Sequence, residues 1–194
     1  MKAALILAGG KAARFNGAQK AFLPLCGKPL IQWVLDAVSF CDEIVISGNS
    51  DLNTFGYPVV EDKISGIGPL AGFQAGFSEI KAEYTFVTGC DMPFLNQKVI
   101  YYLFEKAQLY SCALPKKREY IEPLCCVYNT QDVITCLSSV ITAGTHRLFT
   151  LVKCLPRPRF ISFEDIQRID PGLKSFKNIN TPHDLHCAQE ILHD

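Results

Sequence analysis

The stretch KAALILAGGKAARFNGAQK, residues 2–20, changes character halfway along its length. Its first part, residues 2–8, is a short apolar run that ends at a pair of glycines. A brief apolar run with a glycine boundary is typical of a buried strand. The remainder, residues 9–20, is rich in small residues and carries cations. The stretch therefore predicts a strand followed by a loop whose backbone amides and cations can bind phosphate.

Neither of the two common glycine-rich phosphate motifs occurs in this loop. The Walker sequence GxxxxGK[ST] and the dinucleotide fingerprint GxGxxG are both missing. Glycines and cations alone would equally fit an ordinary turn with solvated charges. The function of the loop therefore has to be decided by the rest of the chain.

Downstream of this loop, apolar strand patterns alternate with helical patterns. Strands are predicted at residues 42–48, 57–62, 84–89, 111–115, 122–129 and 159–164, and helices at 29–40, 68–80, 97–110, 130–153 (two stretches) and 181–193. This βαβ rhythm predicts an α/β fold with a mostly parallel sheet and helices on both faces. At 194 residues a single domain, 1–194, is the default.

Composition excludes several classes of protein. Lys plus Arg and Asp plus Glu both number 19, so the basic excess that is usual for a nucleic-acid binder is missing. No apolar run approaches the roughly 20 residues of a membrane span, and the first apolar run is too short for a signal peptide. We therefore expect a cytoplasmic protein that binds neither nucleic acid nor membrane. The nine cysteines are odd in number and form no CxxC pair, which predicts free thiols.

The loops that follow the predicted strands are the places to look for a site, because ligands bind at the carboxyl ends of parallel strands. Asp91 follows the strand at 84–89 directly, and Asp62 ends the strand at 57–62. A carboxylate opposite a cationic phosphate loop is a natural place for Mg²⁺. The alternative is that Asp91 is a turn residue or a helix cap.

Taken in order, these segments resemble the molybdenum cofactor guanylyltransferases, the MobA family of nucleotidyltransferases. The resemblance rests on LAGG with Arg14 and Lys20, LPLCGKPLIQWVL, VVED, GPLAGFQAGF, TGCDMPFL, EPLCCVY and FKNINTPHDL, which together cover nearly the whole chain. It implies a Rossmann-like α/β domain with a nucleotide-binding half, about 1–115, and a substrate half, about 116–194. It also implies transfer of GMP from GTP, with Mg²⁺, to the phosphate of molybdenum-bound molybdopterin, with release of pyrophosphate.

The resemblance further implies roles for individual residues. The expected nucleotide contacts are Leu7, Ala8, Gly9, Gly10, Lys20, Asp62, Gly68, Asp91 and Asn180. The expected catalytic residues are Arg14, Lys20 and Asp91, with Mg²⁺ on Asp91. Asn178 matches the same NxNTP motif as Asn180. Lys116, Lys117 and Arg118 are candidates for binding the anionic pterin, although a solvated loop fits them equally.

Departures from the family pattern at Phe15, Gln19 and Ser47 leave the nucleoside contacts open. Alternatives within the same class are a molybdopterin cytidylyltransferase and a sugar-phosphate nucleotidyltransferase. An alternative from another class is a non-catalytic nucleotide-binding protein that delivers cofactor. LAGG and GPLAG favour guanylyl transfer, because cytidylyl relatives tend to have LAAG. The expected partners are GTP and a molybdopterin-type cofactor, together with molybdoenzymes or other cofactor-biosynthesis proteins.

Overall fold

The structure is a computed structural model that describes residues 1–9, 18–61, 68–144 and 147–193. Its centre is an eight-stranded sheet in the order β10-β7-β9-β6-β1-β4-β5, with β8 paired to β7. The strands of this sheet are β1 (Lys2–Leu7), β4 (Glu43–Ser47), β5 (Val59–Val60), β6 (Tyr84–Gly89), β7 (Cys112–Lys117), β8 (Tyr120–Ile121), β9 (Cys125–Asn129) and β10 (Pro158–Ser162). A separate small hairpin pairs β2 (Pro24–Leu25) with β3 (Lys28–Pro29).

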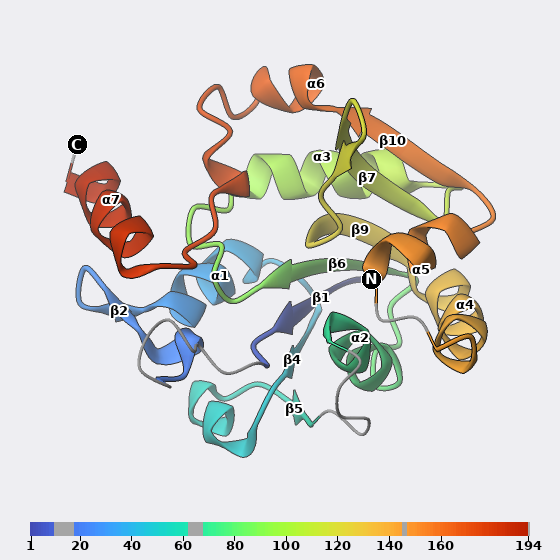
Figure 1. Cartoon of the computed structure of the whole chain (residues 1–194), viewed down its shortest axis with the longest axis horizontal. Coiled ribbons are helices and arrows are strands. Elements are labelled where there is room, and N and C mark those ends of the chain that lie inside the picture. Colours follow the sequence, from blue (N-terminus) through green and yellow to red (C-terminus); the bar gives the residue numbers. More distant parts are fainter. Residues whose placement is uncertain (10–17, 62–67, 145–146, 194) are drawn as a thin grey trace.

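Helices cover both faces of this sheet (Figure 1). The α-helices are α1 (Leu30–Val38), α2 (Pro69–Phe77), α3 (Gln97–Ala107), α4 (Thr130–Thr142), α5 (Leu148–Cys154), α6 (Phe163–Gln167) and α7 (Pro182–His193). The described residues also contain the 3₁₀ turns η2 (Lys20–Phe22), η3 (Ser50–Phe55) and η4 (Lys174–Phe176). Among the helices of the described residues, none is long and apolar enough to cross a membrane.

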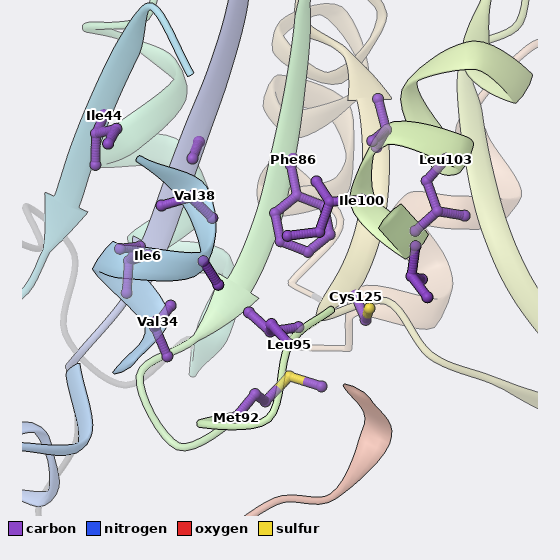
Figure 2. Close-up of a cluster of buried hydrophobic side chains, with 14 of the residues drawn as sticks. Ile6, Val34, Val38, Ile44, Phe86, Met92, Leu95, Ile100, Leu103 and Cys125 are labelled. Carbon is purple, nitrogen blue, oxygen red and sulfur yellow. The ribbon is translucent and has the colours of Figure 1, made fainter. Parts of the chain in front are cut away.

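Each face of the sheet carries its own hydrophobic core. On one face, Ile6 and Phe86 pack with residues of α1 and α3, as Figure 2 shows. On the other face, Leu5 and Val87 pack with residues of α2, α4 and α5. Successive residues of a strand point to opposite faces, so neighbours in β1 and in β6 enter different cores. All four side chains are fully buried, which explains why these strands read as continuous apolar runs.

Strand β1 has parallel neighbours on both sides, and their register fixes the edge of the sheet where the site lies. Leu7, the last residue of β1, is opposite Ser47 of β4 and Gly89 of β6. The Ala8 N–H donates to the Ser47 carbonyl oxygen at 2.7 Å, and the Cys90 N–H donates to the Leu7 carbonyl oxygen at 3.0 Å. The carboxyl ends of three strands therefore lie in one row.

Strand β9 runs in the direction opposite to both of its neighbours in the sheet. It runs antiparallel between β6 and β7, while β7 and β10 are parallel to each other. Cys125, the first residue of β9, pairs with Thr88 near the end of β6. Strand β9 therefore begins at the edge where the parallel strands end, and the residues that precede it lie at that edge.

The predicted α/β class, with a mostly parallel sheet and helices on both faces, is confirmed. The strand predicted at 159–164 was too long, because α6 begins at Phe163. Ser162 ends the strand and caps the helix, accepting the Asp165 N–H at 3.0 Å. The β2–β3 hairpin and η3 were not predicted.

Helix α2 lies close to the sheet because glycines line its inner face. A Cβ on Gly72 would stand 2.7 Å from Ser47 Oγ and 2.9 Å from Leu7 Cδ2, and a Cβ on Gly76 would overlap the Leu5 side chain. Glycine in a helix interior costs about 1 kcal/mol relative to alanine, so close packing has to offset that cost. The close approach brings the N-terminus of α2 to the ends of β1 and β4.

We expect Gly76→Ala to destabilise the fold by about 1–2 kcal/mol, because overpacking a rigid core outweighs the gain in helix propensity. Urea unfolding measures this as a lower midpoint with an unchanged slope. Gly172→Ala is the matched control, since the new methyl group would meet only the flexible Lys174 side chain, at 3.3 Å. This control should stay within about 0.5 kcal/mol of the parent. An unchanged midpoint for Gly76→Ala would refute the close-approach argument.

Candidate active site

Lys20 is the centre of a polar cluster at the carboxyl edge of the sheet. Its Nζ donates to Asp91 Oδ2 at 2.7 Å and to Asn180 Oδ1 at 2.7 Å. The side chains of Lys20 and Asp91 are 21% and 19% exposed. The cluster therefore joins three segments that are distant in sequence and leaves them within reach of a ligand.

Asp91 owes its position to the end of β6. Its carbonyl oxygen accepts the Ile179 N–H at 2.9 Å, which ties the segment that carries Asn180 to this strand end. A Cβ on Gly89 would overlap Asp91 Oδ1, so the glycine leaves room for the carboxylate. While Oδ2 accepts from Lys20, no other residue in the described part of the chain donates to Oδ1. Among the described residues, this second carboxylate oxygen has no hydrogen-bond donor.

This donor set fits Mg²⁺. In the described ranges no three His, Cys, Asp or Glu side chains converge, so an all-protein cage is not formed there. Mg²⁺ commonly uses one or two carboxylates and completes its shell with water and substrate phosphates. The open Oδ1 of Asp91, next to a cation that can bind phosphate, meets that requirement.

The segment that carries Asn180 is held by the first turn of α7. Asp184 Oδ2 accepts the N–H groups of Asn180 at 2.9 Å and Thr181 at 2.8 Å, and Thr181 Oγ1 accepts the Asp184 N–H at 3.1 Å. The reciprocal pair between Thr181 and Asp184 is a capping box. Donation by the Asn180 amide, followed by the Thr181 bonds, lowers the pKa of Asp184, so this carboxylate is charged at neutral pH.

Asn178 has a different environment from Asn180. Its Oδ1 is buried, and no described residue donates a hydrogen bond to it. Because an unpaired buried oxygen costs free energy, a further donor is expected at this position. The two asparagines of the NxNTP motif therefore differ, since only Asn180 joins the lysine cluster.

The remaining predicted nucleotide contacts divide into two groups. Leu7 ends β1 in the row described above, and Ala8 and the exposed Gly9 follow it. Gly68 immediately precedes α2 at φ 59°, a left-handed conformation that suits glycine. Gly10, Arg14 and Asp62 were also predicted to contact the nucleotide or its phosphates, and they lie outside the described residues.

The cations predicted to bind the pterin lie elsewhere. Lys116 Nζ stands 4.8 Å from the centroid of the Phe160 ring and lines a cavity of about 290 Å³, together with Lys153 and Phe149. Lys117 and Arg118 are exposed on the β7–β8 hairpin. In the order of the sheet, β9 and β6 separate β7 from β1. The structure therefore does not bring these cations into the lysine cluster.

Two acidic residues near the carboxyl edge received no role from the sequence. Glu122 is only 6% exposed, and it accepts the Tyr120 O–H at 2.5 Å and the Leu124 N–H at 3.1 Å. Burial and the adjacent carboxylate raise the pKa of Tyr120, which keeps its hydroxyl a neutral donor. The other is Asp184, which the spacing of Thr181, Pro182 and Asp184 could have revealed as a capping box.

Known proteins resemble this chain over most of its length. The sequence profile of the family described as "MobA-like NTP transferase domain" matches residues 4–153. A molybdenum cofactor guanylyltransferase from Desulfosudis oleivorans is 38% identical, covering 97% of this chain and 94% of the relative. A probable molybdenum cofactor guanylyltransferase from Clostridium perfringens is 34% identical, covering 98% of each.

Solved structures share the fold. Molybdopterin-guanine dinucleotide biosynthesis protein A from Archaeoglobus fulgidus superposes with a TM-score of 0.83 at 29% identity, covering 100% of this chain and 99% of that one. A 2-C-methyl-D-erythritol 4-phosphate cytidylyltransferase from Thermus thermophilus gives a TM-score of 0.72 at 15% identity, covering 98% of each chain. The second likeness shows the fold alone.

The nine cysteines differ widely in exposure. Cys26 and Cys154 are exposed, whereas Cys90, which directly precedes Asp91, is buried. Burial, and then the charge of Asp91, raise the pKa of the Cys90 thiol to about 12. Because the thiolate is the reactive form, Cys90 is unreactive at neutral pH despite its place beside the cluster.

We therefore expect iodoacetamide at pH 8 to modify Cys26 and Cys154 first and to leave Cys90 unmodified in the folded protein. Peptide mass spectrometry after timed quenching measures this order. In denaturant all nine thiols should react, since none is paired in the structure. Rapid native labelling of Cys90, or fewer than nine thiols after unfolding, would contradict the assignment.

Proposed function

The chain belongs to the MobA-like NTP transferase family, and from this premise we propose that it is a molybdenum cofactor guanylyltransferase. The reaction joins GMP from GTP to the phosphate of molybdenum-bound molybdopterin and releases pyrophosphate. Relatives with this name, which match the chain over nearly their whole length, support the proposal. The observation that carries it is the cluster of Lys20, Asp91 and Asn180 at the edge where α/β proteins bind nucleotides.

We assign the base and sugar of GTP to the row of strand ends. Leu7 and Ala8 lead to Gly9, whose backbone a ligand can approach closely, and Gly68 offers a second such approach at the start of α2. The sequence adds Gly10 and Asp62 to this proposed set. A carboxylate such as Asp62 suits a ribose hydroxyl or the donor edge of guanine.

The phosphates are assigned to Lys20 and Arg14, with Asp91 as the ligand of Mg²⁺. Lys20 Nζ already has two oxygen partners, so phosphate oxygens can replace or join acceptors that are in place. The metal, when bound, supplies a positive charge that stabilises the phosphate oxygens as bonding changes. Asn180 is assigned to hold the ammonium of Lys20 toward the phosphate oxygens.

The chemical step requires no activated side chain. A phosphate oxygen of the pterin forms a bond to the α-phosphorus of GTP, while the bond from that phosphorus to the bridging oxygen breaks and pyrophosphate takes the electron pair. A phosphate monoester has a second pKa of about 6, so the nucleophile is already an anion at neutral pH. The residues of this chain then act by positioning the two substrates and neutralising charge.

The two halves of the chain serve the two substrates in this proposal. Residues 1–115 bind most of the nucleotide and residues 116–194 bind the acceptor, with GTP and a molybdopterin-type cofactor as the ligands; Asn180 is the exception, because it contacts Lys20 of the first half. Delivery to molybdoenzymes, or exchange with other cofactor-biosynthesis proteins, and a cytoplasmic location remain predictions from the sequence.

One experiment tests the function directly. The protein is incubated with Mg²⁺, molybdenum-bound molybdopterin and either GTP or CTP, and the nucleotide released from the product by hydrolysis is identified. We expect GMP. Recovery of CMP would establish the cytidylyl alternative, and no transfer from either nucleotide would favour a non-catalytic nucleotide-binding protein.

We expect Lys20→Ala to lower the rate by about 10²–10³-fold, because charge stabilisation of the phosphates is lost. Asp91→Asn should remove activity together with its dependence on Mg²⁺. Steady-state rates over a Mg²⁺ titration measure both effects. Lys98→Ala changes an exposed lysine on α3 and should leave the rate unaltered.

Neither Lys20→Ala nor Asp91→Asn should shift the free energy of unfolding by more than about 1 kcal/mol, since a partly exposed ion pair contributes little to stability. Normal Mg²⁺-dependent turnover by folded Asp91→Asn would refute the metal assignment.

We also expect the protein to prefer GTP over CTP, with Gly9 as one reason. A purine is larger than a pyrimidine, and a residue without Cβ lets the backbone approach the base. Gly9→Ala should lower kcat/KM for GTP by about 10–200-fold, the scale of one methyl group in a binding pocket. The slow rate with CTP should barely change. Equal kcat/KM for GTP and CTP in the parent protein would overturn the guanylyl assignment.

A further inference from the structure

One of the two oxygens that accept a hydrogen bond from Lys20 comes from beyond the segment that matches the family profile. That match ends at residue 153, whereas Asn180 lies in the turn before α7. Asn180 is exposed, and an exposed side chain loses conformational freedom when it is held in one orientation. A fixed bond from Asn180 to Lys20 therefore requires that its backbone be held in place by other groups.

Two hydrogen bonds hold that backbone in place. The Asn180 N–H donates to Asp184 Oδ2 at 2.9 Å, and the preceding Ile179 N–H donates to the Asp91 carbonyl oxygen at 2.9 Å. The first bond fixes the segment to α7 and the second fixes it to the end of β6. Asn180 Oδ1 and Asp91 Oδ2 are each 2.7 Å from Lys20 Nζ. The bond from Ile179 to Asp91 fixes the position of one acceptor relative to the other.

We propose that Asp184 is a positioning residue for nucleotidyl transfer. Its carboxylate orients the backbone of Asn180, and the Asn180 side chain orients the ammonium of Lys20 toward the phosphates. This inference rests on the proposed function, because its effect is exerted through the role assigned to Lys20. Asp184 itself touches no reacting atom.

The simpler alternative is that Asp184 only caps α7. Asp184 Oδ2 serves both roles, because it accepts the Thr181 N–H of the capping box as well as the Asn180 N–H, but one bond of the capping box does not involve the carboxylate. Thr181 Oγ1 accepts the Asp184 N–H at 3.1 Å, which serves the helix end, whereas Asp184 Oδ2 accepts the Asn180 N–H, which serves the cluster. Thr181→Ala removes the first bond and leaves the second acceptor in place. It is therefore the matched control within the same turn.

The test compares kcat and KM for GTP in Asp184→Ala and Thr181→Ala, with molybdenum-bound molybdopterin as acceptor. Asp184→Ala should lower kcat by about 10–100-fold, the scale of a small misplacement of a catalytic group. Its KM for GTP should change by less than about threefold, because Gly9 and the other proposed nucleotide contacts remain. Both variants should lose a few degrees of Tm, about 2–4 °C, through the weakened cap. Thr181→Ala should keep its kcat.

A double-mutant cycle with Asn180→Ala then shows whether Asp184 acts through Asn180. In the Asn180→Ala background the change Asp184→Ala should cost less than about twofold, because the side chain it positions is gone. Asp184→Asn retains an acceptor oxygen and should recover most of kcat. If the alanine variant does not fold, Asp184→Ser replaces it in the cycle, because the shorter serine side chain does not reach the Asn180 N–H.

Three results would overturn the inference. They are additive effects in the cycle, an equal loss of kcat in Thr181→Ala, and full kcat in folded Asp184→Ala. If Lys20→Ala is impaired and Asp184→Ala is not, only the positioning role fails. If Lys20→Ala is fully active, the proposed site fails as well.

Discussion

The ammonium of Lys20 connects three parts of the chain through two hydrogen bonds. Its acceptors, Asp91 and Asn180, lie 71 and 160 residues further along the sequence. For these atoms to meet, β6 must end level with β1, and the segment before α7 must cross the end of β6. The parallel register of β1 and β6 satisfies the first condition, and the bond from the Ile179 N–H to the Asp91 carbonyl oxygen satisfies the second. The cluster is therefore a direct consequence of how the sheet is aligned.

Glycines and small residues allow this alignment. Gly72 and Gly76 let α2 lie against β1 and β4, and Gly89 leaves room for the Asp91 carboxylate. A methyl group at any of these three positions would meet a neighbouring side chain at less than 3 Å. These glycines thus set the distance between α2 and the sheet and the room around Asp91. Gly72 and Gly76 lower the helix propensity of α2 but permit its close packing.

The sequence predicted the parallel strands well because each is a short apolar run that ends at a loop signal. It did not predict that β9 runs in reverse, since the direction of a strand depends on how the preceding connection crosses the sheet. Nor did it predict that the strand at 159–164 stops at Ser162, where one hydroxyl both ends a strand and caps a helix. Strand ends and family resemblance together predicted Lys20, Asp91 and Asn180 as site residues, and the structure brings these three side chains together. Asp184 was missed because its hydrogen bonds go to backbone amides, which leave no pattern of side-chain types beyond a capping spacing.

The distance in sequence between Lys20 and Asn180 bears on the order in which the protein is made. Contacts across long stretches of chain close at a large entropic cost, and a growing polypeptide cannot form them before both ends have been synthesised. By the time β6 and α3 have left the ribosome, Lys20 and Asp91 are present, but their third partner is not. Any stabilisation that a bound nucleotide gives through Asn180 is therefore available only after α7 has emerged. Until then, the nascent chain has to fold without that contribution.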